Sequence, residues 1–152
     1  MNSNLADDRK RLSRVAAPDT GAWLSEHELG STLDRIKPFV MPPVAPDALV
    51  DVANLVRVIL RQEIPGDFVE CGVWRGGTAF LMAELLKQAG VRDRKVWLFD
   101  SFEGMPQVEE IDGTAAKAEA NNPDSFLSAE KSRAPIEEVR RAAADRDRKS
   151  VV

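Results

Sequence analysis

The amino-acid sequence predicts an α/β fold in which parallel strands alternate with helices. Two short apolar runs, residues 67–71 and 95–99, have the composition of strands that are buried in a core. Between them, residues 77–89 carry apolar side chains at helical spacing, and Gly90 follows as a typical helix end. Strand, turn, helix and strand form a βαβ unit, whose strands pair in parallel through a right-handed crossover.

The chain before the first strand contains two further predicted helices. Residues 25–36 place Leu29, Leu33 and Ile36 roughly on one side, which predicts a short helix. Four prolines between positions 38 and 46 exclude regular structure there, and the last of them suits the first turn of a helix over residues 46–62. Residues 1–20 lack sustained periodicity, so we expect a mobile arm.

The pattern weakens after Pro106. Residues 107–131 are acidic and rich in alanine, with a turn expected at residues 121–123, and a last helix is predicted near residues 136–144. Three acids in this part have the composition of metal ligands, but we interpret them as a flexible acidic loop; they are Glu109, Glu110 and Asp112.

Composition and charge exclude several classes of protein. The 152 residues are 43% hydrophobic and 30% charged, which is a globular balance, and the net charge of −4 argues against a nucleic-acid binder. Cys71 and His27 are the only residues of their types, so disulfide frameworks and centres built from several cysteines or histidines are excluded. We expect a buried Cys71 and a solvated His27. Apolar stretches fall short of the ~20 residues that span a bilayer, so we expect a cytoplasmic protein.

Two acids at the strand ends, Glu70 and Asp100, mark the candidate site, because ligands of open parallel sheets bind beyond the carboxyl ends of the strands. Gly72 permits a sharp turn after the first strand. Gly76 and Gly77 would let the backbone and a helix N-terminus approach a ligand. A carboxylate after the second strand can accept hydrogen bonds from a ribose diol. The arrangement therefore suits a cofactor that carries a nucleoside.

The turn sequence narrows the choice of cofactor. A phosphate-loop NTPase needs a lysine that is missing from Gly76-Gly77-Thr78, and Trp74 stands where a dinucleotide fold needs its second glycine. A carboxylate at Glu70 fits a cation better than a pyrophosphate, for example the amino group of S-adenosylmethionine. A plain strand-to-helix turn with an exposed Glu70 remains the alternative from the pattern alone.

The segments "IPGDFVECGVWRGGTAFLMAELL" and "VWLFDSFEGMP" resemble the macrocin O-methyltransferase (TylF/MycF-type) family of S-adenosylmethionine-dependent methyltransferases, and the resemblance covers residues 38–106. It implies a Rossmann-like class I methyltransferase core and Mg²⁺-assisted methyl transfer to a hydroxyl group, often on a sugar of a natural product. It also implies a small-molecule acceptor. From the net charge and the lack of a long apolar stretch we expect no nucleic-acid and no membrane partner, and a homo-oligomer is compatible with the sequence.

The resemblance assigns cofactor contacts residue by residue. Those of the first cofactor motif and its turn are Glu70, Gly72, Trp74, Arg75, Gly76 and Gly77. Those around the nucleoside are Asp100, which would hold the ribose, and then Ser101 and Phe102, with Met41 in a lid-like position. For Trp74 an equal alternative is that it plugs the sheet edge or touches a neighbouring subunit.

The resemblance also implies a wider sheet and a longer chain, with the metal ligands and general base on later strands. We therefore assign no catalytic or metal-binding residue. We expect an arm and a short helix at residues 1–37 and a partial cofactor-binding domain at residues 38–146. The fold of this domain would be truncated after the second strand and the helix that follows it. We expect a non-native tail at residues 147–152, which resembles a translated sequencing adapter. Such a chain would be an inactive, poorly stable fragment; the alternative is a non-catalytic nucleotide-binding or interaction module built on one βαβ unit.

Overall fold

The computed structural model describes residues 26–42, 44–126, 128–146 and 150–151. The predicted arm at residues 1–20 lies outside them, as does most of the predicted tail. The elements in chain order are α2 (Glu26–Ile36), η1 (Lys37–Phe39), α3 (Pro46–Arg61), β1 (Phe68–Cys71), α4 (Gly77–Gln88), β2 (Val96–Phe99), η2 (Glu110–Asp112), α5 (Gly113–Ala120), α6 (Ala129–Ser132), α7 (Ile136–Arg146) and β3 (Ser150–Val151).

The sheet confirms the predicted parallel βαβ unit. β1 and β2 pair in parallel, from Phe68 opposite Val96 to Cys71 opposite Phe99, and α4 connects them. A hydrogen bond joins the residues that precede the two strands: Asp67, before β1, accepts the backbone N–H of Lys95, before β2, at 2.9 Å. Beyond the two predicted strands, the structure adds the two-residue β3, which pairs in parallel with β2 and gives the order β1-β2-β3. Two residues carry no periodicity, so the sequence could not signal this strand.

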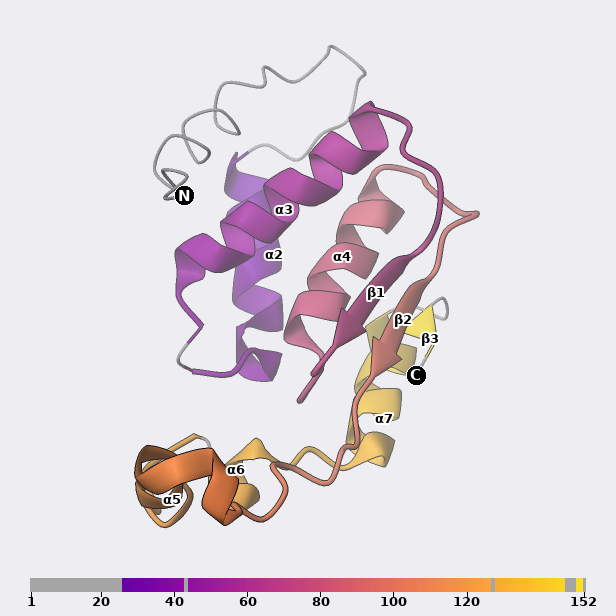
Figure 1. Ribbon diagram of the computed structural model, residues 1–152. Coiled ribbons are helices and arrows are strands. Elements are labelled where there is room, and N and C mark those ends of the chain that lie inside the picture. The colour runs from indigo at the N-terminus through magenta and orange to yellow at the C-terminus, as the bar shows by residue number, and fades with distance from the viewer. Residues whose placement is uncertain (1–25, 43, 127, 147–149, 152) are drawn as a thin grey trace, which may run out of the picture.

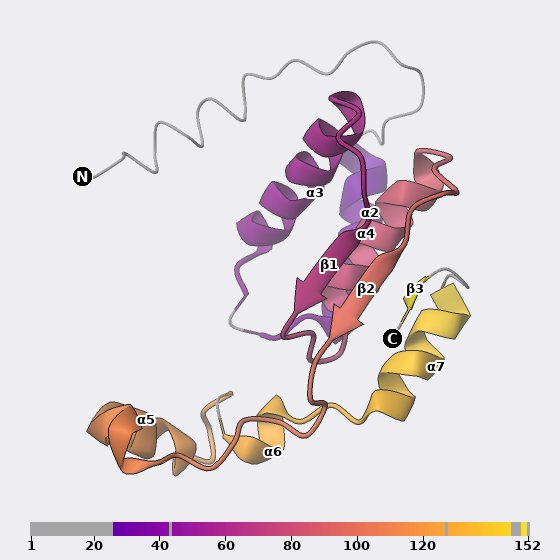
Figure 2. The same cartoon turned by 45° about the vertical axis from the view of Figure 1, so that its right-hand side comes forward.

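α4 is the central helix of the core. It contacts both long strands on one side and α2, α3 and α7 on the others, as Figures 1 and 2 show. Its apolar side chains include Phe80 and Leu81, which are almost fully buried together with Ile36 of α2 and Val56 of α3. The helical spacing that predicted α2, α3 and α4 is therefore the spacing of residues that meet around α4.

Among the residues that the structure describes, helices cover one face of the sheet only, which corrects the expectation of buried strands. Phe68 and Val96 point into the helical layer and are buried, whereas Val69 and Phe99 on the other face are 58% and 57% exposed. Cys71 is also exposed, so the expectation that it is a buried apolar residue is wrong. Alternating strand residues point to opposite faces, and an apolar run alone does not reveal that one face is open.

Residues 107–131 are more regular than expected. They include η2, α5 and the short α6, which lie beyond the carboxyl ends of the strands in Figure 1. The acidic residues form a reciprocal cap rather than a flexible loop, because the Glu109 backbone N–H donates to Asp112 Oδ2 at 2.8 Å and the Glu109 side chain accepts in return. α5 buries no residue, so its sequence lacks the apolar periodicity that would have predicted it. No helix in the described ranges is both long and apolar enough to cross a membrane.

Candidate functional site

The turn between β1 and α4, residues 72–76, is called the glycine turn here. Gly72 and Gly76 have φ angles of 83° and 89°, which glycine adopts freely. Trp74 lies between them with a φ of 50°, in the left-handed region that costs an ordinary L-residue about 1–2 kcal/mol. The turn therefore needs outside support to hold Trp74 in this conformation.

Asp100, at the end of β2, supplies that support. Its Oδ2 accepts the backbone N–H groups of Val73 at 2.6 Å and Trp74 at 3.0 Å, and its Oδ1 accepts that of Phe102 at 2.7 Å. Burial opposes ionisation of Asp100, but the backbone donors around it outweigh burial and hold its pKa below the ordinary value of 3.8. Asp100 is thus an ionised acceptor that joins the ends of β1 and β2.

Glu70 lies beside Asp100 in a different electrostatic environment. Its Oε2 accepts the Ala79 backbone N–H at 3.0 Å, in the first turn of α4. Burial raises the pKa of Glu70 to about 7, and the negative charge of Asp100 acts in the same direction, while hydrogen bonds from Thr78 and Ala79 oppose the rise. The structure therefore brings the two predicted acids together and makes Glu70 a carboxyl group that a nearby cation would ionise.

Close packing within the protein accounts for Gly76 and Gly77. A Cβ at Gly76 would lie 2.7 Å from the ring of Phe80, and a Cβ at Gly77 would lie 2.7 Å from the Phe39 carbonyl oxygen and 2.5 Å from a methyl group of Val40. The space that the sequence assigned to an approaching ligand is, at Gly77, filled by residues 39–40. The segment 37–41, called the strap here, thus lies on the start of α4.

Trp74 contacts the segment that follows β2, and Arg75 lies beside Trp74. The indole Nε1 of Trp74 donates to the Lys131 carbonyl oxygen in α6 at 2.9 Å, and the Arg75 guanidinium lies 4.8 Å from the centre of the indole ring. The indole therefore connects the glycine turn to a distant part of the same chain. This contact corresponds to neither of the two alternatives weighed for Trp74 from the sequence.

The remaining predicted residues surround the ends of β2 and the strap. Phe102 has a φ of 59° and its side chain belongs to the core, while the Ser101 hydroxyl accepts the Glu103 backbone N–H at 3.3 Å. Met41, at the end of the strap, is half-buried and lines an apolar pocket of about 550 Å³ with Leu33 and Leu49 among others. Cofactor contacts of these residues remain predictions.

Sequence reasoning did not find the residues that support the glycine turn from afar. These are Phe39 and Val40 of the strap, which pack on Gly77 directly after the turn, and Lys131 of α6, which binds Trp74 within it; they are separated from these partners by about 37 and 57 positions of sequence. The only signal was that the resemblance to the family begins at residue 38 and so includes most of the strap. Among the residues that the structure describes, no group of three or more His, Cys, Asp or Glu side chains could hold a metal ion, and the His27 side chain lies outside them.

Comparison with known proteins connects this geometry to a family. Residues 36–146 match the family described as Macrocin-O-methyltransferase (TylF), which covers the strap, the glycine turn and both acids. The chain is 48% identical over 67 residues to demethyldecarbamoylnovobiocin O-methyltransferase of Streptomyces niveus and 44% identical over 64 residues to mycinamicin III 3''-O-methyltransferase of Micromonospora griseorubida. It is 51% identical over 53 residues to an 8-demethyl-8-(2,3-dimethoxy-alpha-L-rhamnosyl)-tetracenomycin-C 4'-O-methyltransferase of Streptomyces olivaceus.

A solved structure of an O-methyltransferase has a similar fold. The O-methyltransferase NovP superposes with a TM-score of 0.55 and 36% sequence identity, over 68% of this chain and 42% of that chain. The matches to the three relatives cover 44%, 35% and 42% of this chain but only 25%, 20% and 25% of the relatives. The fold is thus that of a Rossmann-like methyltransferase core, of which the chain contains a part. Because the family match extends over more than half of its residues, the chain belongs to the macrocin O-methyltransferase (TylF) family.

Proposed function

We propose that residues 38–146 form part of the S-adenosylmethionine site of an O-methyltransferase, with the glycine turn and the acids Glu70 and Asp100 as its centre. The observation that carries the proposal is the contrast between the two acids. Asp100 is ionised, and backbone donors stabilise its charge, whereas burial and the charge of Asp100 oppose ionisation of Glu70. A cationic group beside Glu70 would remove that penalty, and the amino group of S-adenosylmethionine is such a cation.

Different residues of the chain would bind different parts of the cofactor. Glu70 would accept hydrogen bonds from the amino group, while its existing bond to Ala79 keeps the carboxylate at the start of α4. Asp100 would accept from the ribose through Oδ1, because Oδ1 accepts one backbone N–H, that of Phe102, whereas Oδ2 already accepts two. Met41, at the end of the strap, would cover the site. When bound, the cofactor supplies an electrophilic methyl group on a sulfonium centre.

The acceptor belongs to the proposal as well. The relatives are named as O-methyltransferases of demethyldecarbamoylnovobiocin, of a tetracenomycin that carries a rhamnosyl group and of mycinamicin III. We therefore propose a small hydroxyl-bearing acceptor, of the glycosylated natural-product class, for the complete protein, together with a cytoplasmic location, assistance by Mg²⁺ and self-association. The described residues offer no group of three ligands for Mg²⁺, so we assign it no residue of this chain.

Calorimetric titration with S-adenosylmethionine tests the proposal. Replacing either Glu70 or Asp100 by alanine should weaken binding by about 1.5–3 kcal/mol, the worth of hydrogen bonds to a charged group. Asp93→Ala is the matched control, because Asp93 is an exposed acid in the connection that precedes β2, at the opposite end of the strands. NAD should not bind. Cofactor affinity that is unchanged in both site variants would refute the assignment.

A further inference from the structure

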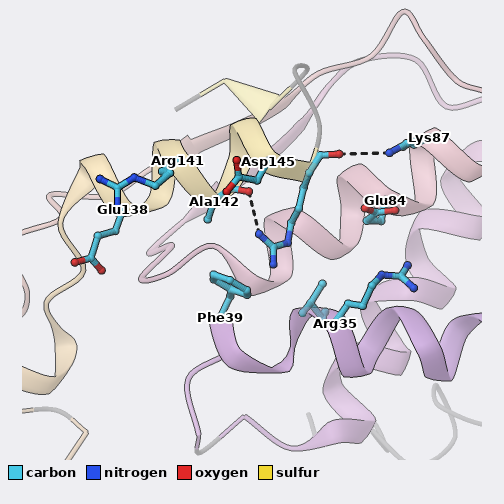
Figure 3. A pocket seen from close by; sticks show the side chains of 10 residues that line it. Arg35, Phe39, Glu84, Lys87, Glu138, Arg141, Ala142 and Asp145 are labelled. Atoms are coloured by element: carbon cyan, nitrogen blue, oxygen red, sulfur yellow. Dashed lines mark hydrogen bonds between the residues drawn. The ribbon is translucent and has the colours of Figure 1, made fainter.

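A second pocket lies along α4. It has a volume of about 780 Å³ and lies between the strap, α4 and α7, as Figure 3 shows from close by. Its lining includes Phe39 of the strap, Lys87 of α4 and the last residue of α7, Arg146. None of these residues belongs to the predicted cofactor contacts. Two of them, Phe39 and Arg146, nevertheless connect to the glycine turn.

We propose that Arg146 is a positioning residue for the cofactor site: its guanidinium holds Phe39, and with it the strap, against the start of α4. The inference rests on the proposed function, because it assigns a role in binding S-adenosylmethionine. Its starting point is the guanidinium carbon, which lies 4.0 Å from the centre of the Phe39 ring and 5.4 Å from that of Phe80. A cation above an aromatic face at these distances is attracted by the ring quadrupole.

Two hydrogen bonds, dashed in Figure 3, hold Arg146 in this position. Its Nη1 donates to the Ala142 carbonyl oxygen one turn earlier in α7 at 3.0 Å. The Arg146 carbonyl oxygen accepts from Lys87 Nζ of α4 at 3.3 Å. The guanidinium is thus oriented by its own helix, and the backbone of Arg146 is hydrogen-bonded to α4. Together these bonds keep the side chain beside the Phe39 ring.

From Phe39 the path to the glycine turn is short. The Phe39 and Phe80 rings pack edge to face, with centres 5.6 Å apart and planes at 75°. Phe80 lies directly under Gly76, and the Phe39 carbonyl lies directly over Gly77, each so close that a Cβ could not be added. Arg146 therefore contacts the rings of Phe39 and Phe80, which pack where the strap meets the start of α4.

The contact between the strap and Gly77 also lies close to the hydrogen bond that holds Glu70. Glu70 accepts its hydrogen bond from Ala79, two residues after the glycine that the strap covers. If the strap leaves Gly77, the start of α4 loses its packing partner and a smaller fraction of molecules holds the binding geometry. The apparent dissociation constant rises in inverse proportion to that fraction. Loss of the Arg146 contact should therefore weaken cofactor binding although Arg146 touches no predicted cofactor residue.

Matched substitutions separate a cation–π contact from simple packing. Arg146→Lys keeps a cation on a long stem, Arg146→Met keeps the length without the charge, and Arg141→Ala removes a guanidinium that lines the same pocket from the same helix. We expect the dissociation constant for S-adenosylmethionine to rise about 3- to 10-fold in Arg146→Met, to rise less in Arg146→Lys and to stay unchanged in Arg141→Ala. Phe39→Leu should weaken binding by itself and remove the effect of Arg146→Met, because the cation then has no ring to contact.

Hydrogen–deuterium exchange of the ligand-free 152-residue chain provides an independent readout. In Arg146→Met, the amides of Val40 and Phe80 should exchange faster than in the parent chain and in Arg141→Ala, because these amides close the turns of the strap and of the α4 start. Unchanged exchange in Arg146→Met, or equal binding by the methionine and lysine variants, would overturn the inference. Failure of the parent chain to bind S-adenosylmethionine would instead refute the proposed function, and with it the role of Arg146 in cofactor binding. The exchange rates would still decide whether Arg146 holds the strap against α4.

Discussion

Glu70 is held in an environment that opposes its ionisation. It is partly buried at the end of β1, and its charged neighbour is the Asp100 carboxylate. The two hydrogen bonds that it accepts, from Thr78 and Ala79, do not compensate for burial. A residue that weakens the folded state in this way is typical of a binding site, where a ligand supplies the missing charge.

The raised pKa of Glu70 predicts how stability depends on pH. Its folded pKa is about 7 and its ordinary value is 4.5, so the unfolded chain releases this proton first. The free energy of unfolding should therefore fall as the pH rises from about 4.5 to about 7 and then level off. Glu70→Gln removes this loss, and we expect it to stabilise the ligand-free protein at about pH 8 by on the order of 2 kcal/mol.

Urea denaturation at several pH values measures this effect. Glu103→Gln is the control, because Glu103 is an exposed acid in the same region of the chain and should change stability little at any pH. The electrostatic account of Glu70 is wrong if Glu70→Gln lowers stability above pH ~7.

At the scale of elements, the start of α4 depends on contact between backbones. Gly77→Ala would place a Cβ 2.7 Å from the Phe39 carbonyl oxygen and 2.8 Å from its carbon, and backbone atoms cannot rotate away as a side chain can. We expect this substitution to lower the free energy of unfolding by about 1–3 kcal/mol and to weaken cofactor binding.

Gly30→Ala is the matched control for that substitution. Gly30 lies within α2, and a Cβ there meets no atom within 4 Å, so alanine should stabilise the protein by about 0.5–1 kcal/mol through helix propensity. Thermal unfolding of both variants measures the difference. Equal effects of the two substitutions would show that the strap does not pack on Gly77 in solution.

The sequence predicted those elements whose residues carry periodic apolar side chains or strong end signals. α3 begins at Pro46 as expected, and α4 begins at Gly77 and ends one residue earlier than expected. α5 was missed because it is rich in alanine and buries no apolar face. Within the site, the positions of Glu70 and Asp100 at the strand ends followed from local pattern. The hydrogen bonds of Asp100 to the glycine turn and the packing of the strap on Gly77 did not, because they join segments far apart in sequence.

At the scale of the whole molecule, the face of the sheet that the described helices leave uncovered is an apolar surface near the site. Val69 and Phe99, with the half-buried Trp97, lie on the face of β1 and β2 that points away from the helices. Exposed apolar side chains gathered on a sheet bind hydrophobic dyes and favour association. The isolated chain should therefore bind such a dye and unfold over a broad temperature range.

Substitution on this face tests that expectation. Val69→Thr combined with Phe99→Thr keeps strand-forming residues but removes apolar area, so dye fluorescence should fall clearly while helix content stays the same. Ile111→Thr is the control, because Ile111 is 89% exposed but lies alone in η2. An equal decrease in the control, or no decrease in the double variant, would show that the sheet face is not the surface that binds the dye.

The most direct test of the proposed site is the pH dependence of S-adenosylmethionine binding to the 152-residue chain. If the cofactor's amino group meets the ionised Glu70, the carboxyl group must lose its proton before or during binding. With a free pKa of about 7, the dissociation constant should be about 10-fold higher at pH ~6 than at pH ~8. Glu70→Gln should bind more weakly at pH ~8 and should lose this pH dependence. Binding that does not vary with pH in the parent chain, or that varies equally in Glu70→Gln, would contradict the account.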